Sequence, residues 1–127
     1  MENVINSHED LFIWKRSRAL IKEIYQLTAN FPKEEMFGII AQMRRSAISV
    51  PSNIAEGAGR KTTKEFIRFL SISSASLSEL ETQIIIAEDL GYTTDSGDLR
   101  RDIIRLRILI HSTIRSLERK LSDLTPK

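Results

Sequence analysis

The chain has 127 residues, a formal net charge of +2 and no cysteine. This length suits one domain with its own hydrophobic core, so we expect a single domain over residues 1–127. The lack of cysteine excludes disulfides, thiolate zinc sites and cysteine nucleophiles, and it fits a reducing cytoplasm. Uncharged runs are too short to span a bilayer and no signal peptide is apparent, so we expect a soluble, cytoplasmic protein with no membrane partner.

Two amphipathic helices are predicted in the first half of the chain. The first covers about residues 10–29, with Ser7 and Asp10 as a capping pair, and its apolar stripe consists of Leu11, Trp14, Ile21, Ile24 and Thr28. The second covers about residues 33–58, because Pro32 suits the first position of a helix. Its apolar stripe consists of Phe37, Ile40, Ala47, Ile54 and Ala58.

Two longer helices are predicted in the second half. The third covers about residues 63–90, with a capping box formed by Thr62 and Glu65 and a stop at Gly91. Its stripe consists of Phe66, Phe69, Leu70, Ser73, Leu77, Leu80, Ile84 and Ala87. The fourth covers about residues 97–122, and its stripe consists of Leu99, Ile103, Leu106, Ile110, Ile114, Leu117 and Leu121. No segment alternates with period two, so we expect an all-α fold, an antiparallel up-down-up-down four-helix bundle.

The second predicted helix contains a proline, Pro51, in the stretch MRRSAISVPSNIAEGAGR. Proline lacks an amide proton and its ring clashes with the carbonyl group four residues earlier. Hydroxyl groups of Ser46, Ser49 and Ser52 can bond carbonyl groups near it, which favours a continuous helix kinked at Pro51 over a break. Gly57 and Gly59 permit close approach of another backbone.

Polar residues line the flank opposite this helix's apolar stripe, and a second polar line runs along the third helix. The first line consists of Arg45, Ser49, Ser52, Asn53, Glu56 and Arg60. The second consists of Ser73, Ser76, Glu79 and Gln83. Three interpretations stay open: a solvated face, a hydrogen-bonded network within or between protomers, and a catalytic site.

The charges are distributed unevenly, since residues 65–99 are mainly acidic and residues 100–127 mainly basic. Arginines at helical spacing on the fourth helix form a candidate nucleic-acid-binding face, consisting of Arg101, Arg105, Arg115 and Arg119. Basic residues of the first helix can add to it, namely Lys15, Arg16, Arg18 and Lys22. A solvated face is the alternative for both sets, and a basic helix often pairs internally with an acidic one. Trp14, Tyr25 and most of the phenylalanines fall on or beside apolar stripes, which disfavours base stacking.

The sequence indicates no enzyme. Residues three before His8 and His111 are isoleucines, so the metal-binding Glu-x-x-His motif of ferritin-like bundles is absent. The sequence contains neither a phosphate-binding loop nor a GxSxG motif. We therefore assign no catalytic residue, metal ligand or cofactor, and an enzyme would depend on Glu56, Glu79 and the arginines alone.

The chain resembles the four-helix-bundle proteins encoded within intervening sequences of bacterial 23S ribosomal RNA genes, over about residues 9–92. The residues that carry the resemblance are Trp14, Ile24, Tyr25, Phe31, Pro32, Gln42, Arg44, Arg45, the run VPSNIAEG at residues 50–57, Arg60, Ser76, Leu77, Glu79 and Leu80. The resemblance implies a bacterial source, a left-handed bundle and assembly as a ring-shaped homopentamer. It also implies a loose link to RNA, because some relatives are encoded within ribosomal RNA genes.

Extra isoleucines on the fourth helix, Ile104 and Ile108, broaden its apolar face and favour either a subunit interface or a deeply buried helix. Together with the resemblance, this predicts a homo-oligomer without enzymatic activity that binds RNA or DNA weakly. The alternative is a scaffold that binds a protein partner and has no nucleic-acid role.

Overall fold

The computed structural model describes residue 8 and residues 11–124, with side chains as far as residue 123. It contains four α-helices and one short 3-10 helix: α1 (Phe12–Thr28), η2 (Lys33–Glu35), α2 (Ile39–Ala58), α3 (Thr63–Asp89) and α4 (Gly97–Leu124). The described part of the chain contains no β-strand. The predicted all-α class is therefore confirmed.

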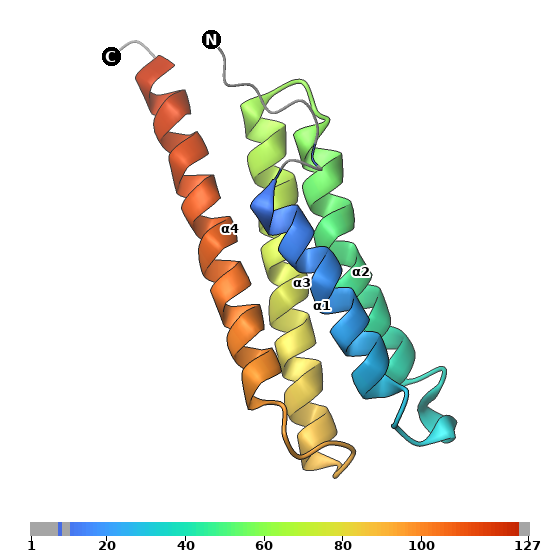
Figure 1. Cartoon of the computed structure of the whole chain (residues 1–127). Coiled ribbons are helices and arrows are strands. Elements are labelled where there is room, and N and C mark those ends of the chain that lie inside the picture. The colour runs from blue at the N-terminus through green and yellow to red at the C-terminus, as the bar shows by residue number, and fades with distance from the viewer. Residues whose placement is uncertain (1–7, 9–10, 125–127) are drawn as a thin grey trace.

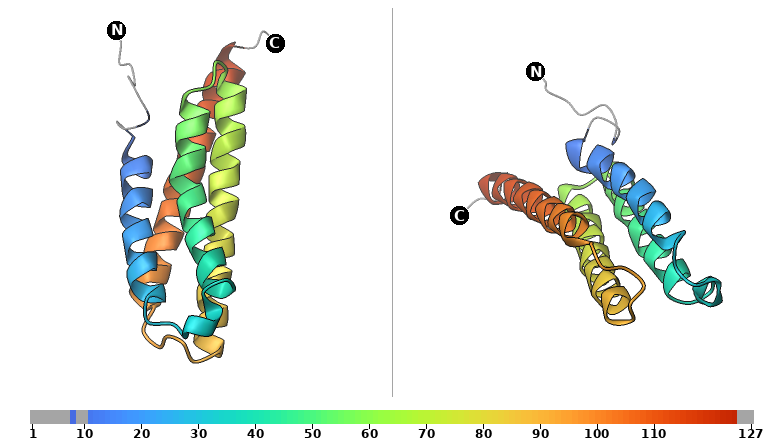
Figure 2. Two further views of the ribbon diagram at one scale, coloured as in Figure 1. Left: turned by 90° about the vertical axis from the view of Figure 1, so that its right-hand side faces the viewer. Right: turned by 60° about the horizontal axis from the view of Figure 1, so that its bottom comes forward.

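The helices pack in chain order. In Figure 1, α1 descends, α2 rises, α3 descends and α4 rises along the long axis of the molecule. The most extensive packing joins α2 to α3, while α1 packs on α2 and α4 packs on α3. The contact between α1 and α4 is the smallest of these, and the right-hand view in Figure 2 shows α1 beside α2 and α4 beside α3.

The core lies between these helices and consists largely of the predicted residues on α3 and α4. Leu70, Leu77, Leu80 and Ile84 of α3 are fully buried, as are Ile103 and Ile110 of α4. On α1 the buried side is rotated from the prediction, because Ile13, Ser17 and Leu20 are buried whereas Leu11, Trp14 and Ile21 are only partly buried.

The prediction that the second helix begins at residue 33 is wrong. Residues 33–35 form the separate 3-10 helix η2, and Gly38, with φ −105° and ψ −118°, has a non-helical backbone before α2 begins at Ile39. The Tyr92 hydroxyl donates a 2.6 Å hydrogen bond to Glu35, which ties η2 to the connection between α3 and α4. Phe37 was expected in the core, but it lies in this turn and is 95% exposed.

The helix α2 continues through Pro51, as its uninterrupted range shows. The Ser52 hydroxyl donates to the carbonyl oxygen of Ile48 at 2.8 Å, and the Ser73 hydroxyl of α3 donates to that of Val50 at 2.9 Å. Both carbonyl groups precede Pro51, and neither belongs to Ala47, whose carbonyl would accept the amide that residue 51 lacks. A bend at Pro51 and the left-handed sense of the bundle stay predictions.

The ends of α3 are formed as the sequence predicts. The Glu65 backbone amide donates to the Thr62 side chain at 3.1 Å, and Gly91, with φ +78°, follows the last turn. The proposed cap at Ser7 and Asp10 lies outside the described residues. None of the described helices combines the length and apolar character that a membrane span requires.

Candidate functional site

A polar groove of about 290 Å³ lies on the surface formed by α2 and α3. We call it the α2–α3 groove, and its lining consists of Gln42, Arg45, Ser46, Ser49, Glu79 and Gln83. Farther along α2, the two helices approach closely, because a Cβ atom added at Gly57 would lie 2.7 Å from the Cβ atom of Phe69. Close approach is therefore confirmed at Gly57, but not at Gly59, where an added Cβ atom would meet only carbonyl oxygens of α2, at 3.7 Å.

A hydrogen-bonded cluster joins the two helices beside this groove. The hydroxyl groups of Ser49 and Ser76 lie 2.8 Å apart. The Asn53 amide donates to the Ser49 carbonyl oxygen at 2.8 Å and to the Ser49 hydroxyl oxygen at 2.9 Å. The structure thus brings together Ser49, Asn53 and Ser76, three residues of the two polar lines seen in the sequence.

The other residues of the two lines do not join this cluster. Glu56 and Arg60 form an exposed pair at 2.6 Å within α2. Ser52 is exposed and bonds its own helix. Arg45 and Glu79 both line the groove and are exposed, yet the ion pairs of the described residues do not include one between them.

The groove can form further polar interactions. The side-chain oxygen of Gln83 is buried and has no hydrogen-bond partner within the described part of the chain. An arginine, a glutamate and an unsatisfied amide oxygen therefore share one groove. Such an arrangement can bind a polar surface by hydrogen bonds and ion pairs.

The two histidines are engaged in local contacts. The His111 ring nitrogen Nε2 lies 2.7 Å from the Ser74 hydroxyl oxygen, and the His8 ring packs edge-on against Trp14 with centroids 4.8 Å apart. No group of three or more histidine, aspartate or glutamate residues that could hold a metal ion occurs among residues 8 and 11–123.

The four predicted arginines of α4 differ in their surroundings. Arg101 pairs with Asp98 and Arg105 pairs with Asp102, one turn earlier on the same helix. Arg115 and Arg119 are exposed and have no acidic partner among the described residues. All four extend from the side of α4 opposite its buried stripe, as their spacing predicts.

Two further arginines of α4, Arg100 and Arg107, face α3. The Arg107 guanidinium donates to Glu81 at 3.1 Å, and Arg100 lies 3.6 Å from Glu88. Neither arginine was predicted from the sequence as a site residue. The acidic third helix and basic fourth helix were the available signal, and part of the positive charge of α4 is indeed paired internally.

The charged residues of α1 divide between two sides of the helix. On the side toward α4, Arg16 lies 3.9 Å from Asp102. Burial and the nearby Asp102 raise the pKa of Glu23, and Arg16 opposes this shift.

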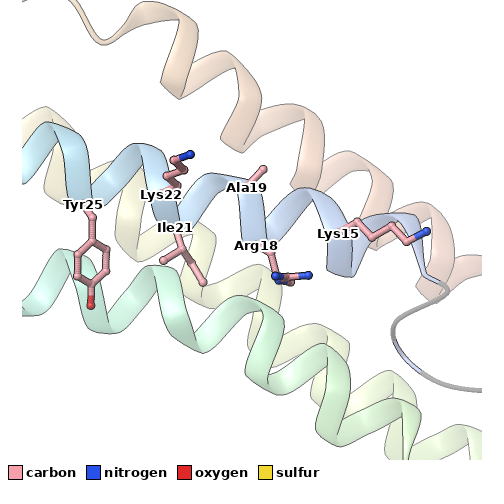
Figure 3. A pocket seen from close by; sticks show the side chains of 6 residues that line it. All are labelled: Lys15, Arg18, Ala19, Ile21, Lys22 and Tyr25. Atoms are coloured by element: carbon pink, nitrogen blue, oxygen red, sulfur yellow. The ribbon is translucent and has the colours of Figure 1, made fainter.

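An open groove of about 660 Å³ runs along α1, and we call it the α1 groove. Its lining consists of Lys15, Arg18, Ala19, Ile21, Lys22 and Tyr25. In Figure 3, Arg18, Ile21 and Tyr25 extend to one side of α1, whereas Ala19 and Lys22 extend to the other. Three of the four basic α1 residues noted in the sequence, Lys15, Arg18 and Lys22, therefore line the α1 groove, whereas Arg16 does not.

A comparison with protein-family models finds a match to the 23S rRNA-intervening sequence protein family over residues 9–112. The matched range includes α1, η2, α2 and α3 and the first half of α4. No curated protein matches the chain.

Proposed function

Because this chain belongs to the 23S rRNA-intervening sequence protein family, we propose that it is a non-enzymatic homo-oligomeric bundle that binds RNA or DNA weakly through basic helix surfaces. The proposed protomer is an antiparallel up-down-up-down, left-handed bundle, and the proposed assembly is a cytoplasmic homopentamer. The non-enzymatic assignment is supported by the family description, which names no reaction.

The observation that carries nucleic-acid binding is the outer face of α4. Arg101, Arg105, Arg115 and Arg119 lie along this one face, and the side chains of Arg101 and Arg105 are 61% and 71% exposed. Asp98 and Asp102 reduce the charge of the first two arginines, so one face alone supports only weak binding. An oligomer repeats the face in each protomer, and the repeated faces then act together.

Self-assembly is supported by apolar side chains that the protomer leaves exposed on α4. Ile104 is 40% exposed, Ile108 is 59% exposed and Leu109 is 39% exposed. Exposed isoleucines that follow each other by one helical turn form an apolar surface suited to a subunit contact. Arg115 lines the same pocket as Ile104 and Ile108, so this contact borders the arginine face of α4.

Binding to labelled single-stranded and duplex RNA and DNA at roughly 50 mM salt tests the function, because phosphate-driven binding is strong at low salt. We expect the variant R101Q/R105Q/R115Q/R119Q to bind more weakly than the unaltered protein. Its slope of log affinity against log salt should fall by about 0.7 for each single-strand phosphate that the variant no longer neutralises, or by about 0.9 for each duplex phosphate. If the unaltered protein binds neither RNA nor DNA, the nucleic-acid function is wrong.

A protein-binding scaffold is the second candidate, and the α2–α3 groove favours it. Gln83 contributes an unsatisfied buried oxygen there, and Arg45 and Glu79 are free to pair with a partner's charges. Capture of proteins from the native host with the unaltered protein and with R45A/E79A tests this candidate. A protein that binds the first and not the second, without any nucleic acid, would favour the scaffold.

A further inference from the structure

Three cations on α1 lack the carboxylate neighbours that most arginines of this protein have. The ion pairs in the described part of the chain involve Arg16, Arg60, Arg68, Arg100, Arg101, Arg105 and Arg107. Lys15, Arg18 and Lys22 take part in none of them. The positive charge of these three side chains is therefore available to an external anion.

Glu23, the acidic residue of α1, does not line the α1 groove. Glu23 is influenced by Asp102 and Arg16, the residues at the contact of α1 with α4. Its carboxylate thus belongs to a mixed-charge group with Arg16 and Asp102 and not to the lining of the α1 groove. Folding places Glu23 with Arg16 and Asp102, and it leaves the α1 groove lined by three cations and no carboxylate.

Cation–π contacts involve two side chains that line the α1 groove, Arg18 and Tyr25. The Arg18 guanidinium lies over the Trp14 ring, 4.9 Å from its centroid. The Arg44 guanidinium lies over the Tyr25 ring at 4.3 Å and donates to the Thr28 hydroxyl at 3.0 Å. A guanidinium stacked on a ring keeps N–H groups at its edge free for a phosphate, so Arg18 is positioned to donate.

The groove also offers apolar and aromatic surface between the cations. Ala19, Ile21 and Tyr25 line it, and Tyr25 is 38% exposed although one ring face is covered by Arg44. Figure 3 shows Arg18 and Lys22 extending to opposite sides of the helix. Lys15 and Lys22 are seven residues apart, which corresponds to about 10 Å along the helix.

We propose that the α1 groove binds single-stranded nucleic acid, with Lys15, Arg18 and Lys22 contacting phosphate groups and Tyr25 contacting a base. Cations beside exposed aromatic surface are the combination that binds single strands without sequence preference. A duplex offers phosphates but no unstacked base for Tyr25. The inference rests on the proposed function, and it adds the α1 groove as a second contact surface beside the outer face of α4.

Binding of a labelled 20-nucleotide oligouridylate to the full chain, followed by fluorescence anisotropy, tests this assignment. We expect K15Q/R18Q/K22Q to weaken binding by roughly tenfold or more at about 50 mM salt, and to lower the salt slope by about 2, since each neutralised single-strand phosphate contributes about 0.7. The matched control K61Q/K64Q/R68Q removes the same charge from exposed residues at the start of α3 and should change affinity by less than about threefold. Unchanged circular dichroism would show that both variants retain their helices.

The base contact is tested separately with Y25L. This variant should weaken oligouridylate binding by roughly five- to hundredfold, the range expected when one base stack is removed, and leave binding of inorganic polyphosphate unchanged. Equal weakening for both ligands, or none for either, would overturn the base contact.

The outcomes separate the α1 assignment from the proposed function. If the unaltered protein binds oligouridylate and K15Q/R18Q/K22Q binds equally well, the α1 assignment is wrong while nucleic-acid binding stands. If duplex RNA binds more tightly than oligouridylate, the preference for single strands is wrong. If the unaltered protein binds neither, the proposed function fails together with this inference.

Discussion

The hydroxyl oxygens of Ser49 on α2 and Ser76 on α3 lie 2.8 Å apart, and the Asn53 amide also donates to the Ser49 hydroxyl. Ser76 is 5% exposed, so neither water nor another side chain can easily replace its partner. A buried polar group that loses its hydrogen bond destabilises the fold. The pair therefore fixes the register of the two helices that pack together most extensively.

Replacing these serines should show that they are coupled. We expect S49A and S76A each to lower the free energy of unfolding by about 1 kcal/mol, and the double variant to lose less than the sum of the two. Urea denaturation measures all three. S52A, which removes an exposed hydroxyl that bonds only its own helix, is the control and should cost less than about 0.5 kcal/mol. Strict additivity of the two single losses would show that the pair has no energetic significance.

Gly57→Ala should destabilise the contact between α2 and α3. The added Cβ atom would lie 2.7 Å from the Phe69 Cβ atom and 3.2 Å from the Phe66 carbonyl oxygen, so the helices must move apart. We expect a loss of about 1–3 kcal/mol in unfolding free energy. Gly59→Ala is the matched control, since its Cβ atom would meet nothing closer than 3.7 Å. Equal stability of the two variants would contradict the close approach.

The sequence predicted the buried faces of α3 and α4 well and that of α1 less well. On α1, Ile13 and Leu20 are buried beside Ser17, a polar residue that a search for apolar spacing leaves out. The Ser17 hydroxyl donates to the Trp14 carbonyl oxygen at 2.8 Å, which makes its burial inexpensive. Adjacent apolar residues at positions 13–14 and 20–21 also fit either face. Spacing alone therefore cannot decide which face is inside.

The start of α2 and the charge pairing depend on residues far apart in the chain. Glu35 is separated from Tyr92 by 57 positions, so a local sequence pattern cannot predict the hydrogen bond that holds η2.

The two polar lines of the sequence included Ser49 and Ser76, and a network between them was one of the interpretations left open. Which arginine pairs with which carboxylate depends on helix packing, and the sequence showed only that a basic helix follows an acidic one.

A charge on the exposed apolar side of α4 should dissociate the assembly. We expect I108E to shift the protein toward the monomer, because burying an unpaired carboxylate in an apolar contact costs several kcal/mol. Sedimentation velocity at micromolar concentration measures the shift. Q26E adds the same charge at an exposed position of α1 and should leave the assembly unchanged. An unchanged sedimentation coefficient for I108E would place the subunit contact elsewhere.

Glu23 should lower the free energy of unfolding as the pH rises, whereas a carboxylate with a depressed pKa would raise it. Its folded-state pKa lies above the usual 4.5, so the folded protein binds its proton more tightly than the unfolded chain does. Its contribution to stability is therefore lost as pH rises from 4.5 through the raised pKa. We expect E23Q to be at least as stable as the unaltered protein at pH 7, with the advantage shrinking as the pH falls through the raised pKa toward 4.5, as thermal unfolding across pH would show. An advantage that grows as the pH falls would contradict this direction.

Glu81→Ala should destabilise the packing of α4 on α3. The Glu81 side chain is 18% exposed and lies within ion-pair distance of both Arg107 and Arg100, whose buried Nε atoms have no hydrogen-bond partner among the described residues. We expect a loss of about 1–3 kcal/mol in unfolding free energy, because Arg107 loses its carboxylate and Arg100 keeps only its contact with Glu88. E56A breaks the exposed pair with Arg60 and should cost less than about 1 kcal/mol. Similar losses for E81A and E56A would show that burial does not strengthen the α3–α4 ion pairs.

The claim that this chain functions as a homo-oligomer is tested most directly by its mass in solution. Multi-angle light scattering after size exclusion, at micromolar concentration and moderate salt, reports that mass independently of shape. We predict a single species of several times the chain mass of 14.5 kDa, with five copies for the proposed ring. A single species of 14.5 kDa would contradict the proposed assembly.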